Sequence, residues 1–101
     1  MIEITNRHGE IVVKGHAGYA EHGQDIVCAA ISTLTQVFVE SVRELTKDKI
    51  KSDITAGNAV VKYGNLTEQG KLLLDSFLLG IQMICESYPA HVRMESEVND
   101  E

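Results

Sequence analysis

The first half of the chain changes from a strand-like to a helix-like pattern of apolar residues. Apolar side chains alternate at Ile2 and Ile4 and return in 11–13, with Asn6-Arg7-His8-Gly9 between them. This pattern predicts two strands joined by a turn. From Ile26 onward apolar residues recur every three or four positions, which predicts an amphipathic helix. The stripe of this helix consists of Val27, Ile31, Leu34, Phe38, Val42 and Leu45.

Charged residues mark both ends of this helix. Asp25 directly precedes it and suits the N-cap, because a carboxylate accepts hydrogen bonds from the free N–H groups of a first turn. Lys47 and Lys49 follow its other end, where cations complement the helix dipole.

The second half repeats the order of hairpin and then helix. Ile54 and the segment 60–63 flank Ala56-Gly57-Asn58, which predicts a second hairpin with a glycine-containing turn. Thr67 suits the N-cap of a second helix, which Pro89 ends. The apolar stripe of that helix consists of Leu73, Leu74, Phe77, Leu78, Ile81, Ile84 and Cys85.

The resulting order is strand-strand-helix-strand-strand-helix, and the alternating segment 91–98 offers a fifth, edge strand. We therefore predict an α+β fold of two layers, in which two helices cover one face of a mostly antiparallel sheet. A chain of 101 residues can bury one hydrophobic core and is too short for two, so we expect 1–101 to be a single domain. The pattern leaves the order of the strands open.

Composition and charge narrow the classes of function. The net charge of −6 and the pI of about 5.1 argue against a general nucleic-acid binder, which carries a basic surface. No apolar run approaches the ~20 residues of a membrane span. The segment 1–10 does not resemble a secretion signal, and two cysteines are too few for a disulfide framework. We expect a cytoplasmic protein with reduced thiols and no membrane contact.

One segment, GHAGYAEHGQDIVCAA at 15–30, crowds glycines around reactive side chains. With Asp25 as N-cap, Cys28 falls in the first helical turn, where free N–H groups and the helix dipole favour an anion. The thiolate is the nucleophilic form of cysteine. His16 ends the second predicted strand, and the loop between them can bring imidazole and thiol together. This is the Cys–His arrangement of nucleophilic catalysis, with the Cys28 N–H as a candidate oxyanion donor.

Two other interpretations of these residues remain open. A cysteine in the small apolar segment 27–30 is often a buried core residue. His16, His22 and Cys28 are evenly spaced and could bind a metal, but structural zinc takes four ligands, and no fourth is evident nearby. We therefore expect neither a metal nor a cofactor.

Two polar residues flank the nucleophile candidate. Asp25 either caps the helix, which stabilises it by ~1 kcal/mol, or orients His16 as a third catalytic member. A capping carboxylate is already occupied by backbone N–H groups, which favours the cap. Ser32 lies one turn after Cys28 on the same face, and it either bonds near the thiolate or, more commonly for serine, back to its own helix.

The loop 17–24 has little apolar surface to hold it in place, and it connects the two catalytic candidates. We predict that it is a lid which closes over a bound peptide. Gly18, Tyr19, His22 and Gly23 are its candidate substrate contacts.

The segments Gly15-His16-Ala17 and 25–32, with Gly23 between them, closely resemble the signature of the ribosomal-processing cysteine protease family, Prp. The resemblance covers nearly the whole chain. It implies a bacterial endopeptidase that removes the short N-terminal extension of large-subunit ribosomal protein number twenty-seven. It further implies that Cys28 is the nucleophile, that His16 is the general base, and that the protein is a homodimer.

The acidic chain suits such a substrate, since ribosomal proteins are typically basic and opposite charges attract. The alternative, from another class, is a non-enzymatic ribosome-assembly or protein-interaction module that keeps the fold without the chemistry.

Overall fold

The computed structural model describes residues 1–18, 20, 25–55 and 57–96. Seven elements follow one another in these ranges, five strands and two helices. They are β1 (Ile2–Arg7), β2 (Glu10–Lys14), α1 (Ile26–Leu45), β3 (Ile50–Thr55), β4 (Asn58–Tyr63), α2 (Glu68–Ser87) and β5 (Val92–Ser96).

The five strands form one sheet in the order β3-β4-β2-β1-β5. The pairings β1–β2, β2–β4 and β3–β4 are antiparallel, while β5 runs parallel to β1. The predictions of a mostly antiparallel sheet and of a fifth, edge strand are therefore confirmed. The parallel pairing follows from connectivity: α2 crosses over the sheet between β4 and β5, so that β5 starts beside the N-terminus of β1.

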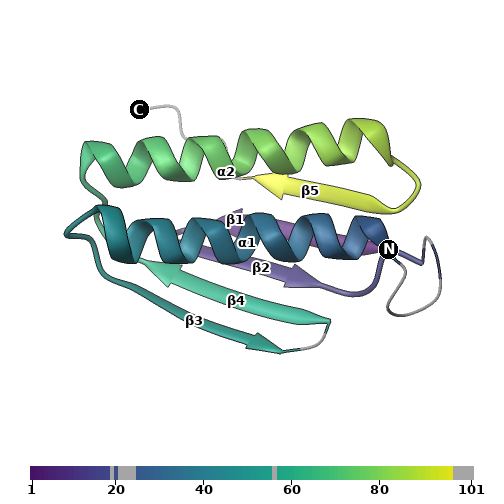
Figure 1. Ribbon diagram of the computed structural model, residues 1–101, viewed down its shortest axis with the longest axis horizontal. Helices are drawn as coiled ribbons and strands as arrows, with labels where there is room; N and C mark the ends of the chain where they lie inside the picture. Colours follow the sequence, from purple (N-terminus) through teal and green to yellow (C-terminus); the bar gives the residue numbers. More distant parts are fainter. Residues whose placement is uncertain (19, 21–24, 56, 97–101) are drawn as a thin grey trace.

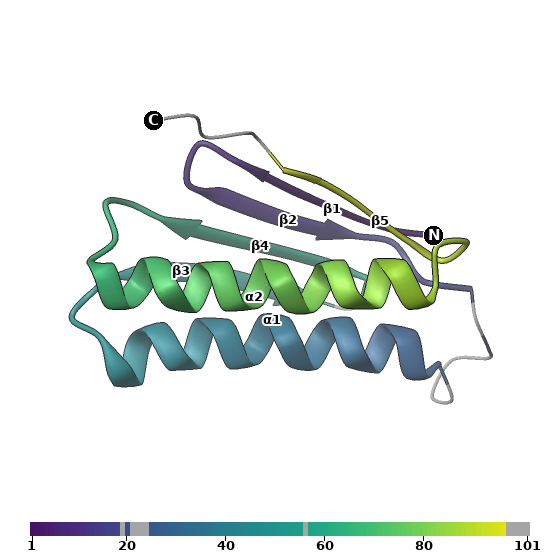
Figure 2. The ribbon, with the colours of Figure 1, turned by 90° about the horizontal axis from the view of Figure 1, so that it is seen from above.

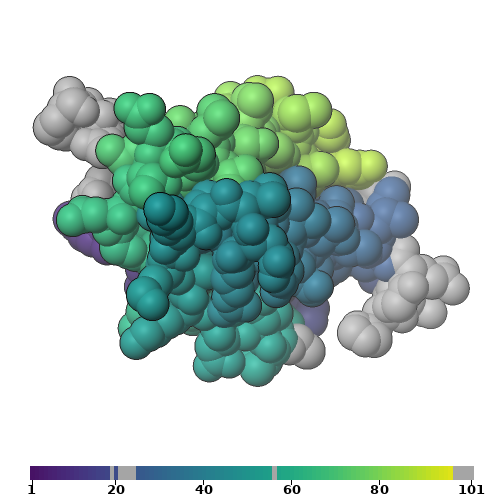
Figure 3. All heavy atoms as spheres, turned by 60° about the vertical axis from the view of Figure 1, so that its left-hand side comes forward, coloured from purple at the N-terminus to yellow at the C-terminus, as the bar shows by residue number. Residues whose placement is uncertain are grey.

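The two helices lie side by side on one face of the sheet, as predicted (Figures 1 and 2). Figure 3 shows the surface of this layer, with α1 between α2 above it and β3 below it. Phe38 of α1 stacks on Phe77 of α2, with ring centroids 5.1 Å apart, and this contact holds the helices together within the core. The start of α1, the end of β2, the β3–β4 turn and the α2–β5 connection all lie at the same end of the molecule (Figure 1).

The core lies between the helices and the sheet. Its largest fully buried side chains come from both layers: Ile4, Ile11, Ile31, Ile81, Val27, Val42 and Val61. The predicted stripe of the first helix holds except at its end, where Leu45 is 70% exposed. Leu45 is the last residue of α1, and the chain has already passed the edge of the core at that point.

The first turn is tighter than the sequence predicts. Asn6 and Arg7 belong to β1 and pair with Ile11 and Glu10, which leaves only His8-Gly9 as the turn. Both turn residues have positive φ, 50° at His8 and 79° at Gly9, as a two-residue hairpin of the type I′ kind requires.

Of the described helices, α1 is long and apolar enough by length and composition to cross a membrane, with a mean hydropathy of 1.3. The expectation that no apolar run approaches this length is therefore wrong. The core helix of a soluble protein meets the same criteria. Here the side of α1 that carries Val27, Ile31 and Val42 is buried in the core.

Candidate active site

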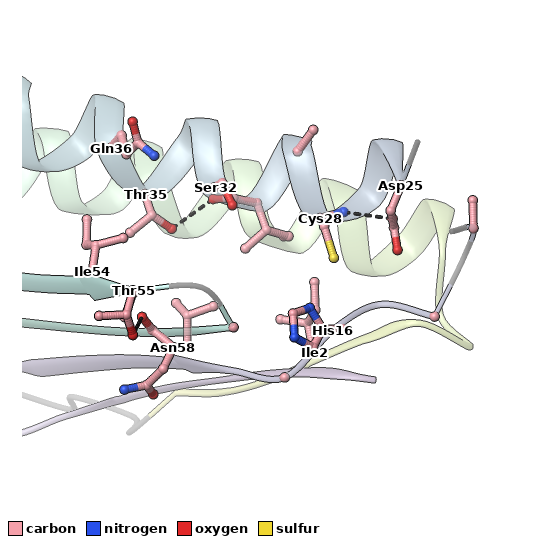
Figure 4. A pocket seen from close by; sticks show the side chains of 18 residues that line it. Ile2, His16, Asp25, Cys28, Ser32, Thr35, Gln36, Ile54, Thr55 and Asn58 are labelled. Carbon is pink, nitrogen blue, oxygen red and sulfur yellow. Dashed lines mark hydrogen bonds between the residues drawn. The ribbon is translucent and has the colours of Figure 1, made fainter. Parts of the chain in front are cut away.

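The end of β2, the start of α1 and the β3–β4 turn surround a cavity of about 630 Å³. His16, Asp25, Cys28, Ser32 and Gly18 all line it, so the fold brings together the described residues that the sequence singles out. From the thiol the cavity extends along α1 toward the β3–β4 hairpin. Its lining there includes Gln36, Ile54, Thr55 and Asn58, which Figure 4 labels.

Asp25 is the N-cap of α1. Its Oδ1 accepts hydrogen bonds from the backbone N–H groups of Val27 and Cys28, each at 3.0 Å. The Asp25 backbone is extended (φ −82°, ψ 99°), as an N-cap residue requires. The Cys28 N–H is therefore engaged by the cap, and it is not the free oxyanion donor that the sequence suggests.

Cys28 lies in the first turn of α1, and its side chain is half-buried. Its Sγ points from the helix toward the sheet (Figure 4). The backbone N–H of Ala17, which follows β2, donates a hydrogen bond to this sulfur at 3.2 Å. Cys28 also packs against the core cluster, so the interpretation as a small core residue describes part of its side-chain contacts but not its polar one.

His16 follows β2, and its ring lies on the sheet side of the cavity, facing the Cys28 sulfur (Figure 4). Between these two side chains the structure gives no hydrogen bond within the residues it describes. Catalytic hydrogen bonds commonly tighten only when substrate binds, so the free arrangement is compatible with proton transfer between them.

Gly57, in the β3–β4 turn, provides the space for the His16 imidazole. A Cβ at this position would lie 2.8 Å from Nε2 and 3.1 Å from Cε1 of His16. Its φ of +75° is also in the left-handed region. The sequence predicts this turn, but it gives no signal that the turn meets His16, because the contact joins segments about forty residues apart.

Gly15 fixes the chain where it leaves β2 toward His16. Its N–H donates to the Gly57 carbonyl at 2.9 Å, and its φ is +99°. A Cβ at Gly15 would collide with the carbonyl oxygen of Met1. The two glycines thus join the end of β2 to the β3–β4 turn and hold the base candidate between them.

Ser32 is exposed, lines the cavity and lies one turn beyond Cys28. The expected back-bond of Ser32 to its own helix does not occur within the described residues. Thr35 makes such a bond instead, from Oγ1 to the Ile31 carbonyl at 2.8 Å (Figure 4). Thr35 is buried, so its hydroxyl bonds within the helix, whereas Ser32 is exposed at the cavity and leaves its hydroxyl available there.

Gly18 lines the cavity with a φ of +69°, and a Cβ there would meet nothing within 4 Å. Tyr19, His22 and Gly23 lie outside the described residues, so their predicted contacts and the lid of 17–24 stay predictions. Among the described residues, no three His, Cys, Asp or Glu side chains converge on a metal site.

Cys85 differs from Cys28 in its surroundings. It lies on α2, half-buried, and packs against the core cluster as predicted. Burial, with a smaller contribution from the Glu86 carboxylate, raises the pKa of the Cys85 thiol. This thiol is therefore a weaker nucleophile at neutral pH than an ordinary cysteine.

The sequence model of the family described as "Cysteine protease Prp" matches residues 1–93. The chain belongs to this family. The Prp family resemblance drawn from the motif is thereby confirmed, and the protein is a cysteine peptidase. Membership favours the enzyme over the non-enzymatic module.

The sequences of individual Prp proteins align with most of this chain. The ribosomal processing cysteine protease Prp of Mycoplasma genitalium is 32% identical, over 96% of this chain and 97% of that protein. The Prp of Staphylococcus aureus is 28% identical over 84% and 83% of the two chains. The crystal structure of the S. aureus protease with a covalently linked product peptide has a TM-score of 0.85 at 24% identity, covering 95% of this chain and 97% of that one. The Prp fold is therefore the fold of this chain.

Proposed function

We propose that this protein is an endopeptidase with Cys28 as nucleophile and His16 as general base. Its proposed substrate is the N-terminal extension of large-subunit ribosomal protein number twenty-seven. The observation that carries the proposal is the convergence of His16 and Cys28 on one cavity from opposite layers of the fold (Figure 4). No other described thiol shares a cavity with a histidine, because the Cys85 cavity has none in its lining.

The position of Cys28 supports its role as nucleophile. The first turn of a helix places positive potential at the sulfur, and the Ala17 N–H adds a donor at 3.2 Å. Both can stabilise negative charge on the sulfur once His16 has taken its proton.

The reaction then follows from the two side chains. His16 takes the Cys28 proton, and the thiolate attacks the carbonyl carbon of the scissile bond, forming a C–S bond as the carbonyl electrons move to oxygen. When that intermediate collapses the C–N bond breaks, and the imidazolium gives its proton to the departing amine. A water molecule, deprotonated by His16, hydrolyses the thioester and restores the thiol.

The length of the cavity supports a peptide substrate. From Cys28 to Gln36 the helix advances eight residues, about 12 Å, which matches about four residues of extended peptide. Ile54, 42% exposed on β3, offers an apolar contact at that distal end. A peptide lying along α1 would thus reach from the thiol to the β3–β4 hairpin.

The identity of the substrate is supported by relatives and by charge. The M. genitalium protein, 32% identical, carries the name of a ribosomal processing protease. A net charge of −6 favours approach of a basic ribosomal protein. These two points also favour a cytoplasmic location, which we include in the proposal, because ribosomal proteins meet their ribosomes there.

The decisive experiment mixes the purified protein with the extended ribosomal protein of the same cell. Mass spectrometry should show a shortened product with a new N-terminus. Cys28→Ala should yield none, while the matched variant Cys85→Ala should process at the rate of the unaltered protein. An intact precursor with the unaltered protein would refute the substrate, and cleavage by Cys28→Ala would refute the nucleophile.

We further propose that the protein is a homodimer that pairs through the outer face of α2. Leu72, Leu79 and Met83 are spaced by seven and four residues, so they form one stripe, and each is at least 60% exposed. A second copy would bury this stripe. The chain has a mass of 11.1 kDa, and light scattering should give twice that value. Leu79→Glu should return the monomer. A monomeric unaltered protein at micromolar concentration would contradict the pairing.

A further inference from the structure

His91, in the α2–β5 connection, is linked to the nucleophile through a single residue, Ala17. Its Nδ1 lies 2.9 Å from the carbonyl oxygen of Ala17. The N–H of the same Ala17 donates to Cys28 Sγ at 3.2 Å. A carbonyl oxygen only accepts hydrogen bonds, so Nδ1 carries the hydrogen in this contact.

We propose that His91 is a positioning residue for the cysteine protease reaction, holding Ala17 so that its N–H points at the nucleophilic sulfur. The proposal rests on the proposed function in one respect only, that Cys28 is the nucleophile. His91 acts through Ala17 and does not touch the thiol.

The backbone of His91 is itself fixed, as a positioning residue requires. Its N–H donates to the Tyr88 carbonyl at 2.9 Å, and its carbonyl accepts from the N–H of Ile2 at 2.9 Å. These bonds tie the α2–β5 connection to the end of α2 and to the start of β1. The imidazole is therefore presented from a rigid support at the catalytic end of the molecule (Figure 1).

Ala17 needs such an anchor because it follows the last residue of β2 by three positions and belongs to neither strand nor helix. Its side chain is 3% exposed, which fixes the position of its Cα. Burial alone does not set the rotation of the two peptide units that meet at Ala17. The hydrogen bond from His91 holds the unit that carries the Ala17 carbonyl, while the N–H that points at the sulfur belongs to the other unit, so the bond limits how far residue 17 can turn as a whole. A peptide turned away from Cys28 would remove a donor from the thiolate.

The first experiment measures iodoacetamide alkylation of Cys28 at pH 7 by mass spectrometry, without any substrate. Loss of a hydrogen bond that favours the anion should slow alkylation about three- to tenfold in His91→Ala. His91→Asn should restore the rate, because its Nδ2–H group occupies the place of Nδ1–H. His91→Gln should not, since its amide reaches the place of Nε2.

Arg93→Ala is the matched control. Arg93 lies two residues away on β5 and pairs with Glu3 of β1 at 2.5 Å, so its loss perturbs the same edge of the sheet without a link to Cys28. Its alkylation rate should equal that of the unaltered protein. If His91→Ala fails to fold, the comparison of Asn with Gln decides alone.

A second readout is turnover of the extension peptide, where His91→Ala should lower kcat more than it changes KM. Cys28 alkylation in His91→Ala at the unaltered rate would overturn the proposal. Equal rates in folded Asn and Gln variants would overturn it as well. If Cys28 alkylation is slower in His91→Ala and the unaltered protein does not cleave the extension peptide, the role of His91 is upheld and the proposed substrate is contradicted instead.

Discussion

The His16 imidazole lies directly against Gly57, with Nε2 only 2.8 Å from the place a Cβ of residue 57 would occupy. The base candidate is therefore placed by a turn that comes about forty residues later in the chain. A side chain at that turn would compete with the imidazole for the same space.

Gly57→Ala should displace the His16 ring and lower kcat/KM about 100-fold, as misplacement of a catalytic group by about 1 Å typically does. The left-handed φ of +75° should also destabilise the variant by about 1–2 kcal/mol. Peptide cleavage and thermal unfolding separate the two effects. Gly64→Ala is the control, since a Cβ there meets nothing within 4 Å. Unchanged kcat/KM in Gly57→Ala would show that catalysis does not require the His16 ring to lie against residue 57.

The two cysteines should react with iodoacetamide at different pH. Burial and Glu86 raise the pKa of Cys85, so its thiolate forms only above the pH at which an ordinary thiol ionises. Cys28 should be labelled at pH 7 and Cys85 hardly at all, with Cys85 labelling increasing as the pH rises past 9. Denaturation should remove the difference. Equal rates in the native protein at pH 7 would contradict the reactive position assigned to Cys28.

Asp25→Ala should remove both capping hydrogen bonds and destabilise the protein by about 1 kcal/mol, equivalent to a fall in Tm of about 4–8 °C. Asp25→Asn should keep most of the stability, because its amide oxygen can accept the same bonds. Calorimetry of the pair measures this. If Asp25→Asn kept its Tm but lost its activity, Asp25 would have an orienting role beyond the cap.

Ile54→Ser should weaken peptide binding at the distal end of the cavity, raising KM about tenfold with little change in kcat. Stability should hardly change, because Ile54 is already 42% exposed in the free protein. Val37→Ser removes an exposed apolar side chain of α1 outside the described cavity lining and should leave KM unchanged. A peptide truncated to three residues on each side of the cleaved bond should bind Ile54→Ser and the unaltered protein equally. Unequal binding of that short peptide would place Ile54 nearer the thiol than proposed.

Local features of this protein are readable from the sequence. Asp25 before an apolar stripe sets the start of α1, and a start at Ile26 places Cys28 in the first turn whatever the rest of the chain does. Such signals work because capping and helical periodicity depend only on residues a few positions apart. They also fix His16 near the end of β2, and together with the family motif they identify the two catalytic candidates.

The tertiary structure alone decided how these local pieces meet. Pairing of β5 with β1 in parallel brings the α2–β5 connection, and with it His91, to the end of the molecule where Ala17 and Cys28 lie. Pairing of β4 with β2 brings Gly57 under His16. The sequence predicts neither, because both contacts join residues some forty or seventy positions apart, and no local pattern records which strand lies beside which. The hydrophobic pattern selects a sheet face, whereas strand order depends on how the whole chain buries that face at once.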